Sequence, residues 1–496
     1  MIAADLPVLQ VVVPLVAAPL CLLLRRGTLA WLLAAAVGWF SLYTALQLLG
    51  SVSPGEEIRY ALGGWAPPWG IEYRVDRLDA YVLVIVAAIG ALVLTYARAS
   101  VEREIAARQR APFYAALLLC LAGLLGIVIT GDAFNLFVFL EISSLSSYAL
   151  ISLGRDRRAL TASYQYLIMG TLGATFILIG VGLLYMVTGT LNMLDLAALI
   201  PAVADNRTVT AAVAFLLVGI CLKIALFPLH LWLPNAYAYA PSVVTAFLAG
   251  TATKVAVYVL LRFIFTVFGF GVGLSFSATL LSVALLTLAL AGLLTASTVA
   301  IFQDDVKRML AYSSVAQIGY IMLGIGLLSA TGLTAALVHL FNHAVIKSAL
   351  FLALGCVVYR VGAARLSDLR GLGRRMPLTL AAFVAGGLSL IGVPLTAGFI
   401  SKWYLVLAAL EAGLWPVALL VLVGSLLAVI YIWRVVEVAY LEPASGHTAS
   451  VREAPWHLLL PTWVLILANL WLGIDTDLTV GTASGIAAEL LGGAAR

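Results

Sequence analysis

Charged residues are scarce in this chain of 496 residues: they make up 10% of it, whereas 63% of the residues are hydrophobic. Soluble domains are about 45–50% apolar and about 25% charged, so this composition excludes a soluble globular protein. It predicts an all-α protein that crosses a membrane many times.

Cysteine is also rare. Cys21, Cys120, Cys221 and Cys356 lie in apolar stretches and form none of the Cys or Cys/His spacings of a metal site. We therefore expect them to be packing residues, and we expect neither a metal nor a cofactor. The net charge of +5 is not gathered into a long basic cluster, which argues against a nucleic-acid partner.

Lysine is the least used charged residue. The chain has 23 arginines but only five lysines, namely Lys223, Lys254, Lys307, Lys347 and Lys402, and four of the five fall in apolar spans. Nucleotide bias could explain an excess of arginine. It does not explain why lysine persists at membrane depth, where a buried ammonium can release its proton and a guanidinium cannot. The pattern favours groups that titrate.

Apolar windows of about 20 residues, the length that crosses a bilayer, occur fourteen times. They cover 7–24, 29–49, 79–97, 113–130, 134–152, 162–187, 210–231, 243–268, 274–297, 309–328, 332–359, 378–410, 414–438 and 457–474. Positive charge gathers on the odd-numbered connections, for example around 98–110, 155–158 and 360–375. This pattern places both termini outside the cytoplasm of a bacterial cell. The N-terminus lacks the basic region and cleavage site of a signal peptide, so we expect a retained first span.

No connection is long enough for a soluble domain, so we expect a single membrane domain over 1–496. Within it we expect N-terminal helices in 1–112, five-helix units in 113–268 and 274–440, and a last helix in 441–496. Because each unit has an odd number of helices, the second would be inverted relative to the first.

Prolines interrupt two of these spans. Pro228 and Pro234 flank His230 in the seventh, and Pro394 lies in the twelfth. Proline removes a backbone donor, and transporters of the inverted-repeat kind break helices at this depth. We therefore expect spans seven and twelve to be discontinuous, although prolines that merely kink helices are also common in membranes.

A lone carboxylate, Glu141, lies in the fifth span. An ionisable group at membrane depth is costly and needs a partner, and Lys223 in the seventh span is the natural one. Pairing with a carboxylate raises the proton affinity of a lysine, and separating the two lowers it. Movement of Glu141 would therefore switch Lys223 between binding and releasing a proton. The alternative is a static salt bridge between two helices.

Three polar residues of the eleventh span, His339, His343 and Lys347, are four residues apart and so share one helix face. Each step rises about 6 Å, a gap that water can bridge. The three residues predict a row of titratable groups near the middle of the membrane, in which we also place Glu141, Lys223, His230, Lys254 and Lys402 as a path for protons. The row offers one firm carboxylate and many cations, which suits protons and not Na⁺. The residues just before span ten, Asp304 to Arg308 with Lys307, are expected to form a solvated loop.

The motifs TGDAFNLFVFLE, LKIALFPLHLWLPNAYAYAPS, GTATK, DVKRMLAYSS, FNHAVIKSALF and GVPLTAGFISKW occur in this order along the chain. Together they resemble the antiporter-like subunits shared by Mrp-type cation/proton antiporters, respiratory complex I and membrane-bound hydrogenases. The resemblance implies proton-path roles for Glu141, Lys223, Lys254, Lys402 and the helix-eleven segment. GDAFNLFVFLEISSLSSYALISLG and GLGRRMPLTLAAFVAGG are most similar to the D-type member of the Mrp antiporter subunits.

Three functions therefore stay open at this point. The resemblance implies a subunit that moves protons for a multi-subunit Na⁺/H⁺ antiporter, with Na⁺ handled by partner subunits in the membrane. The first alternative is a pumping subunit of complex I or a hydrogenase, where the energy comes from a redox partner. The second is a scaffold in which the buried charges only hold helices together. None of the three makes this chain an enzyme by itself.

Overall fold

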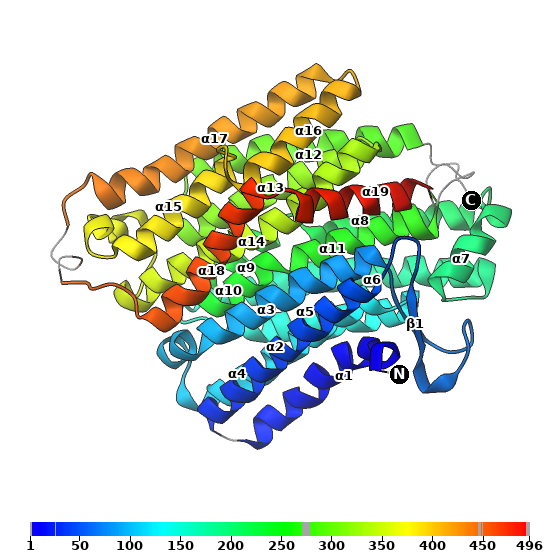
Figure 1. Cartoon of the computed structure of the whole chain (residues 1–496), viewed down its shortest axis with the longest axis horizontal. Coiled ribbons are helices and arrows are strands. Elements are labelled where there is room, and N and C mark those ends of the chain that lie inside the picture. Colours follow the sequence, from blue (N-terminus) through cyan, green and yellow to red (C-terminus); the bar gives the residue numbers. More distant parts are fainter. Residues whose placement is uncertain (1, 25, 270–277, 445–447, 449, 493–496) are drawn as a thin grey trace.

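Long apolar helices make up most of the structure, a computed structural model that describes residues 2–24, 26–269, 278–444, 448 and 450–492. The long helices lie side by side, with α1 at one flank and α17 at the opposite flank (Figure 1). Their apolar side chains pack against one another inside the bundle and suit contact with lipid outside it. Their backbone N–H and C=O groups form hydrogen bonds within each helix, as a bilayer requires.

The first half of the chain contains α1 (Ile2–Leu23), α2 (Gly27–Ser51), α3 (Arg77–Glu104), α4 (Arg110–Ile129), α5 (Ala133–Ser152), α6 (Arg158–Thr188), α7 (Met193–Leu199), α8 (Arg207–Ile224), α9 (Trp232–Tyr239), α10 (Ser242–Gly250), α11 (Ala252–Leu261) and the π-helical turn η4 (Arg262–Val267). The second half contains α12 (Ala278–Ile301), α13 (Val306–Gly326), α14 (Ala330–Val361), α15 (Pro377–Ile391), α16 (Ala397–Glu411), α17 (Trp415–Tyr440), α18 (Trp456–Ile474) and α19 (Thr482–Gly492).

Thirteen segments of the described chain are long and apolar enough to cross a membrane. The remaining predicted span, the twelfth (378–410), forms the two 15-residue helices α15 and α16 instead of one long helix. The prediction of an all-α, polytopic membrane protein with about fourteen crossings is confirmed. The predicted start of the ninth span, at residue 274, lies outside the described residues.

The two discontinuous spans break in a similar way. α8 ends at Ile224 and α9 begins at Trp232, with Pro228 between them, and Pro394 lies between α15 and α16. Each break also contains a non-glycine residue in the left-handed region, Ala225 (φ 61°) and Leu395 (φ 70°). Such residues cost about 1–3 kcal/mol each and persist only where the surrounding structure holds them.

Pro234 does not break a helix, so that part of the prediction was wrong. It lies in the first turn of α9, where the backbone N–H that proline lacks would have no partner within the helix.

The eighth span is interrupted too, which its sequence does not predict. α10 ends at Gly250, and α11 starts at Ala252 after the non-helical Thr251 (φ −121°, ψ −58°). The Thr251 hydroxyl donates a hydrogen bond of 2.7 Å to the carbonyl of Phe247. A Cβ at Gly250 would lie 2.1 Å from Ser348 Oγ, so only glycine allows α10 to approach α14 this closely.

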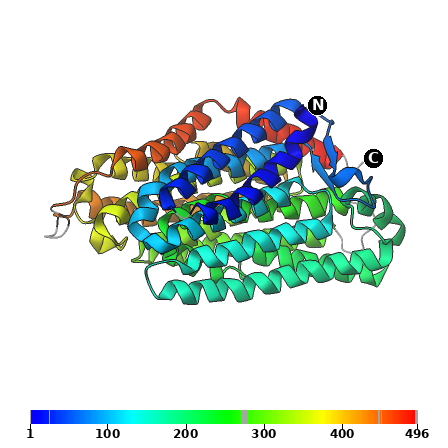
Figure 2. The same cartoon turned by 90° about the horizontal axis from the view of Figure 1, so that it is seen from below.

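A small hairpin is the other departure from an entirely helical chain. The strand β1 (Ile58–Ala61) pairs with β2 (Glu72–Val75) in an antiparallel register that sets Ile58 opposite Val75. This hairpin lies in the connection between α2 and α3, at the same end of the bundle as the start of α1 and the end of α19 (Figures 1 and 2).

Both ends of the described chain thus lie at one end of the bundle, as an even number of crossings requires (Figures 1 and 2). Which end faces the cytoplasm stays a prediction, as does the division into two inverted units. α14 is mostly buried and packs against α10, α13, α15, α16 and α18. The predicted polar ladder therefore lies on a helix enclosed by other helices.

Candidate functional site

Glu141 on α5 and Lys223 on α8 meet between the two helices. Lys223 Nζ lies 4.0 Å from Glu141 Oε1 and donates a hydrogen bond of 2.8 Å to Ser144 Oγ. The Lys223 side chain is 7% exposed and the Glu141 side chain 27%. Glu141 Oε1 is buried and has no hydrogen-bond partner among the described residues. The pair is therefore a loose contact, with the serine as the closer partner of the lysine.

A small cavity adjoins Lys223. Its volume is about 40 Å³, and it lies between the serines of α5 and the first turns of α11. The residues that line it include Ser143, Ser144, Ser147, Tyr166, Lys223, Ala252, Val255, Ala256 and Val259. A polar cavity holds a water molecule once it offers about 10–15 Å³ to the probe and two or more polar partners. Water in this cavity would connect Lys223 toward the helix that carries Lys254.

Lys254 lies directly after the break in the eighth span. Its Nζ donates a hydrogen bond of 2.5 Å to the carbonyl of Ala249, on the other side of the break, and lies 3.4 Å from Thr253 Oγ1. Its side chain is buried, with the residue 1% exposed. No described carboxylate lies within 4.0 Å of this ammonium, since Lys223 is the only lysine in the described chain with an ion pair.

The predicted ladder on α14 is buried throughout, with His339 3% exposed and both His343 and Lys347 0%. The two imidazole rings are stacked, with centroids 5.9 Å apart. His339 Nδ1 shares a hydrogen bond of 2.8 Å with Ser401 Oγ, and Lys347 Nζ donates one of 2.8 Å to the carbonyl of Leu310.

Several polar atoms of the ladder lack a partner in the part of the chain that the structure describes. Neither nitrogen of His343, nor Nε2 of His339, has a hydrogen-bond partner there, and Asn342 Oδ1 is likewise unpaired. Leaving a buried polar atom unpaired costs about 1–3 kcal/mol, so sites of this kind are usually occupied by water. The arrangement therefore fits the predicted water-linked ladder.

Lys402 on α16 reaches back across the break in the twelfth span. Its Nζ donates hydrogen bonds of 2.9 Å to the carbonyls of Leu390 and Ile391 and of 3.0 Å to Ser425 Oγ on α17. It also lies 4.6 Å above the ring of Tyr320 on α13. Tyr320 in turn is 5.5 Å from His339, centroid to centroid, so aromatic and hydroxyl groups join Lys402 to the ladder.

His230 lies in the break of the seventh span and contacts α13. Its ring is 5.3 Å from that of Phe227 and 6.4 Å from that of Tyr312, centroid to centroid. It is buried, and its Nδ1 has no partner among the described residues. Within the described chain no direct contact joins His230 to the lysines, so its predicted place on the proton path stays a prediction.

Lys307 is not in a solvated loop, so that prediction was wrong. It lies in the first turn of α13, is 7% exposed, and donates a hydrogen bond of 2.7 Å to the carbonyl of Ala240. Burial follows because Ala240, at the end of α9, packs over this turn and needs a donor for its carbonyl. All five lysines of the chain are thus buried. The sequence contained a signal for this burial, since Lys307 was the only one of the five lysines expected in a loop and the other four were expected to be buried.

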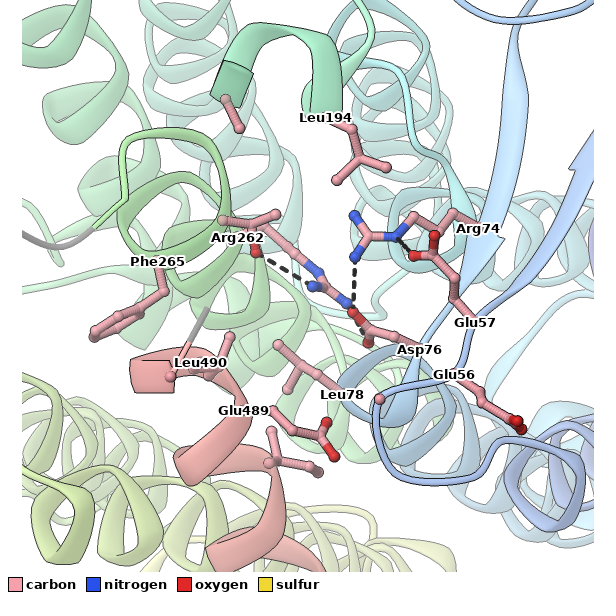
Figure 3. A pocket seen from close by; sticks show the side chains of 15 residues that line it. Glu56, Glu57, Arg74, Asp76, Leu78, Leu194, Arg262, Phe265, Glu489 and Leu490 are labelled. Carbon is pink, nitrogen blue, oxygen red and sulfur yellow. Dashed lines mark hydrogen bonds and ion pairs between the residues drawn. The ribbon is translucent and has the colours of Figure 1, made fainter. Parts of the chain in front are cut away.

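Arg262, the first residue of η4, lies in a second charged cluster (Figure 3). Its guanidinium contacts Asp79 and donates to Asp76 Oδ1 at 2.5 Å, while Arg74 pairs with Glu57 at 2.5 Å. Burial alone would raise the pKa of Asp76, but Arg262 outweighs it and holds that pKa well below its usual range. The cluster ties the hairpin to α3 and η4.

The described residues contain no group of three or more His, Cys, Asp or Glu side chains that could hold a metal ion. The side chains brought together here are lysines, histidines and hydroxyl groups, with Glu141 as the carboxylate that contacts them. Such groups exchange and pass protons, whereas hard cations bind to several oxygen ligands.

Comparison with known proteins gives a consistent result. Residues 130–428 match the family model described as NADH:quinone oxidoreductase/Mrp antiporter, transmembrane. The chain is 44% identical over 490 residues to the N subunit of the NADH-quinone oxidoreductase of Desulforudis audaxviator, with 96% of both chains covered. It is 31% identical over 418 residues to the D-type subunit of the Na⁺/H⁺ antiporter of Alkalihalophilus pseudofirmus, with 84% of this chain and 83% of the relative covered.

A solved structure agrees with these relatives along the whole chain. A chain in the structure of the Mrp complex from a Dietzia species superposes with a TM-score of 0.89 at 29% identity, covering 99% of this chain and 98% of that one. The relatives are thus subunits of multi-subunit membrane complexes. This chain belongs to the NADH:quinone oxidoreductase/Mrp antiporter family of membrane subunits.

Proposed function

We propose that this protein moves protons through the membrane as one subunit of a multi-subunit cation/proton antiporter of the Mrp type. One observation carries the proposal: four lysines and two histidines are buried among the helices of the bundle, and Glu141 is the one described carboxylate in an ion pair with any of them. A scaffold role does not explain such a set, because apolar residues would pack the same helices without the cost of burying charge.

In the mechanism, each lysine alternates between a charged and a neutral state. Lys254, Lys347 and Lys402 bind backbone carbonyls or hydroxyls in place of carboxylates. Such dipoles solvate an ammonium without fixing its charge, so the lysine can pass its proton on. Water in the cavity beside Lys223 and along the unpaired histidine nitrogens would carry the proton between lysines.

Glu141 acts as the control at one end of the row. When it approaches Lys223 it favours the charged ammonium, and when it withdraws it favours release of the proton. The 4.0 Å separation and the nearer serine fit a carboxylate that can move away without breaking a tight ion pair.

Na⁺ would be handled by partner subunits, since the described residues along this row include no cluster of carboxylates. The protein would reside in the bacterial cell membrane, with the arginine-rich end of the bundle facing the cytoplasm.

A redox-driven complex is the second candidate, and one observation favours it. The relative with 44% identity is named as a subunit of an NADH-quinone oxidoreductase. The same row of lysines would then move protons with energy supplied by electron transfer in a partner, because the family's membrane subunits share this arrangement of helices.

The test is transport by the complete complex in everted membrane vesicles. Dissipation of a preformed pH gradient on addition of Na⁺, without any electron donor, supports the antiporter. Proton uptake that requires NADH and stops with an electron-transfer inhibitor supports the redox-driven complex. Transport that persists unchanged when Lys254 and Lys402 are both replaced by Met would refute proton movement along the row in either setting.

A further inference from the structure

Five arginines surround a hollow at the end of the bundle formed by the odd-numbered connections. Its volume is about 670 Å³, and its lining includes Arg158, Arg308, Arg365, Arg370 and Arg434 against three carboxylates, Asp304, Asp305 and Glu442. Arg434 pairs with Asp304 at 3.3 Å and Arg370 with Glu442 at 2.7 Å. Arg158 pairs with Asp156 at 2.5 Å, so Arg308 and Arg365 are the arginines of the hollow without an ion pair among the described residues.

Arg308 differs from the other arginines of the hollow in having a buried nitrogen without a partner among the described residues. It forms no ion pair with a described carboxylate, and its Nε is buried without a hydrogen-bond partner among the described residues. Its guanidinium lies 5.9 Å from the ring of Tyr312, a cation–π contact at the limit of the usual range that supplies no hydrogen-bond acceptor for Nε. A buried guanidinium N–H without an acceptor is costly, so an acceptor from outside the chain is expected here.

A second groove of about 460 Å³ begins at the same arginine. It runs between α6, α9 and α13 and is lined by Tyr164, Gln165, Ile168, Met169, Leu231, Trp232, Asn235, Arg308 and Tyr312. Tyr164, Ile168 and Leu231 are 62%, 44% and 68% exposed. Large apolar side chains exposed on a membrane-spanning helix face lipid, so this groove opens toward the bilayer.

We infer that the two hollows together form a binding site for one anionic phospholipid. Its phosphate would bind Arg308, its headgroup would lie in the arginine-rich hollow, and one acyl chain would lie along Ile168, Met169 and Leu231. Basic pockets between helices at the cytoplasmic side of membrane proteins bind anionic headgroups in this way. A free phosphate would use the arginines but would leave the apolar groove empty.

The site adjoins the broken helix of the seventh span, so a lipid bound there would affect the transport path. Leu231 is the last residue of the break in the seventh span, next to His230, and Trp232 is the first residue of α9; both line the groove. A bound chain would support the broken segment from the lipid side. This inference does not depend on whether the complex is driven by Na⁺ or by electron transfer.

The experiment measures lipid retention and thermal unfolding of the purified full-length protein, with phosphatidylglycerol, phosphatidylcholine or inorganic phosphate added. We expect phosphatidylglycerol to stay bound in native mass spectrometry and to raise the unfolding temperature, and the other two to do neither. Arg308→Gln should weaken phosphatidylglycerol binding about tenfold or more, because charge-assisted hydrogen bonds to phosphate are lost.

Arg98→Gln is the matched control, since Arg98 is an exposed arginine of α3 paired with Glu102 at 3.6 Å and lines neither hollow. It should bind phosphatidylglycerol as the unaltered protein does. If Arg308→Gln does not fold, Leu231→Gln tests the apolar groove and should also weaken retention. The inference would be overturned if Arg308→Gln, or Leu231→Gln in its place, retained as much phosphatidylglycerol as Arg98→Gln does. So would stabilisation by inorganic phosphate, which indicates a free-anion site, or loss of lipid binding in the assembled complex, which indicates that a partner subunit covers the groove.

Discussion

Lys402 Nζ donates a hydrogen bond of 2.9 Å to the carbonyl of Leu390, although the two residues lie on opposite sides of the break between α15 and α16. Lys254 makes the same kind of contact with Ala249 across the break in the eighth span. In both places the break supplies a carbonyl that a continuous helix would have used internally. The breaks therefore create the polar surroundings that allow a lysine to lie inside the membrane.

Replacing Glu141 by Gln should leave the complex assembled but strongly reduce transport. The amide keeps the volume and hydrogen bonding of the carboxylate but loses the charge that acts on Lys223, 4.0 Å away. The measurement is cation- or donor-driven proton movement in everted vesicles, with assembly checked by the size of the purified complex. Normal transport by Glu141→Gln would mean that the pair only holds α5 against α8.

Much of the fold was predictable because hydropathy and proline report directly on membrane helices. The fourteen crossings, the breaks at Pro228 and Pro394, and the burial of four lysines all follow from the distribution of apolar residues and cations. The break at Thr251 was not predictable, since it contains no proline and depends on the close approach of Gly250 to Ser348 of α14. Contacts between helices that are distant in the chain cannot be predicted from the local sequence of either helix.

The candidate site was predictable in its members but not in its connections. The pairing of Glu141 with Lys223 follows from the rule that buried charges need partners. How the helices pack decides the connections. Packing sets Ser144 nearer to Lys223 than Glu141 is. It also joins Lys402 to His339 through Tyr320 and buries Lys307 under Ala240. The sequence also gives no sign that Arg308 borders two hollows, because their linings come from several separate helices.

His343→Ala and Lys347→Ala should each impair proton movement more than stability. Both residues are 0% exposed, yet neither ring nitrogen of His343 has a partner among the described residues, so the loss of its ring removes no hydrogen bond made with them. Transport in reconstituted vesicles should fall by about a hundredfold or more, the contribution typical of a group that transfers protons. A change in unfolding temperature with normal transport would show that the ladder is only packing.

Lys307→Met should destabilise the protein. The substitution leaves the carbonyl of Ala240 without its 2.7 Å donor, which costs about 1–3 kcal/mol for a buried group. The unfolding temperature of the purified protein measures this, with Arg98→Met as an exposed control. An unchanged unfolding temperature would mean that water replaces the lysine and that the contact contributes no stability.

Arg262→Gln should weaken the cluster shown in Figure 3 in a manner that depends on pH. Although burial opposes it, Arg262 holds the pKa of Asp76 well below its usual range. A lowered folded-state pKa contributes stability above the unfolded value of about 4 and loses it as the pH falls below that value. The contribution of Asp76 to the difference in unfolding temperature between the unaltered protein and the variant should thus shrink as the pH falls below about 4. Asp79 also contacts Arg262 and adds a pH dependence of its own, so the test is made between about pH 4 and about pH 2. A difference that does not shrink in this range would contradict the role given to Asp76.

Lys223→Arg separates a fixed charge from one that titrates. If Lys223 only neutralises Glu141, arginine should serve about as well, because it keeps the charge and offers more donors. If Lys223 must release its proton when Glu141 withdraws, the arginine variant should assemble and yet fail to transport, since a guanidinium does not lose its proton at working pH.

Lys307→Arg cannot serve as a silent control for this substitution, because Lys307 is itself buried. Arg98→Lys is the appropriate one, since it exchanges the same two residues at an exposed position 3.6 Å from Glu102 and should transport normally. Transport is measured as proton movement in everted vesicles, and assembly by the size of the complex. A Lys223→Arg variant that assembles and transports at the unaltered rate would refute the idea that the lysines of the membrane row are kept for their protons.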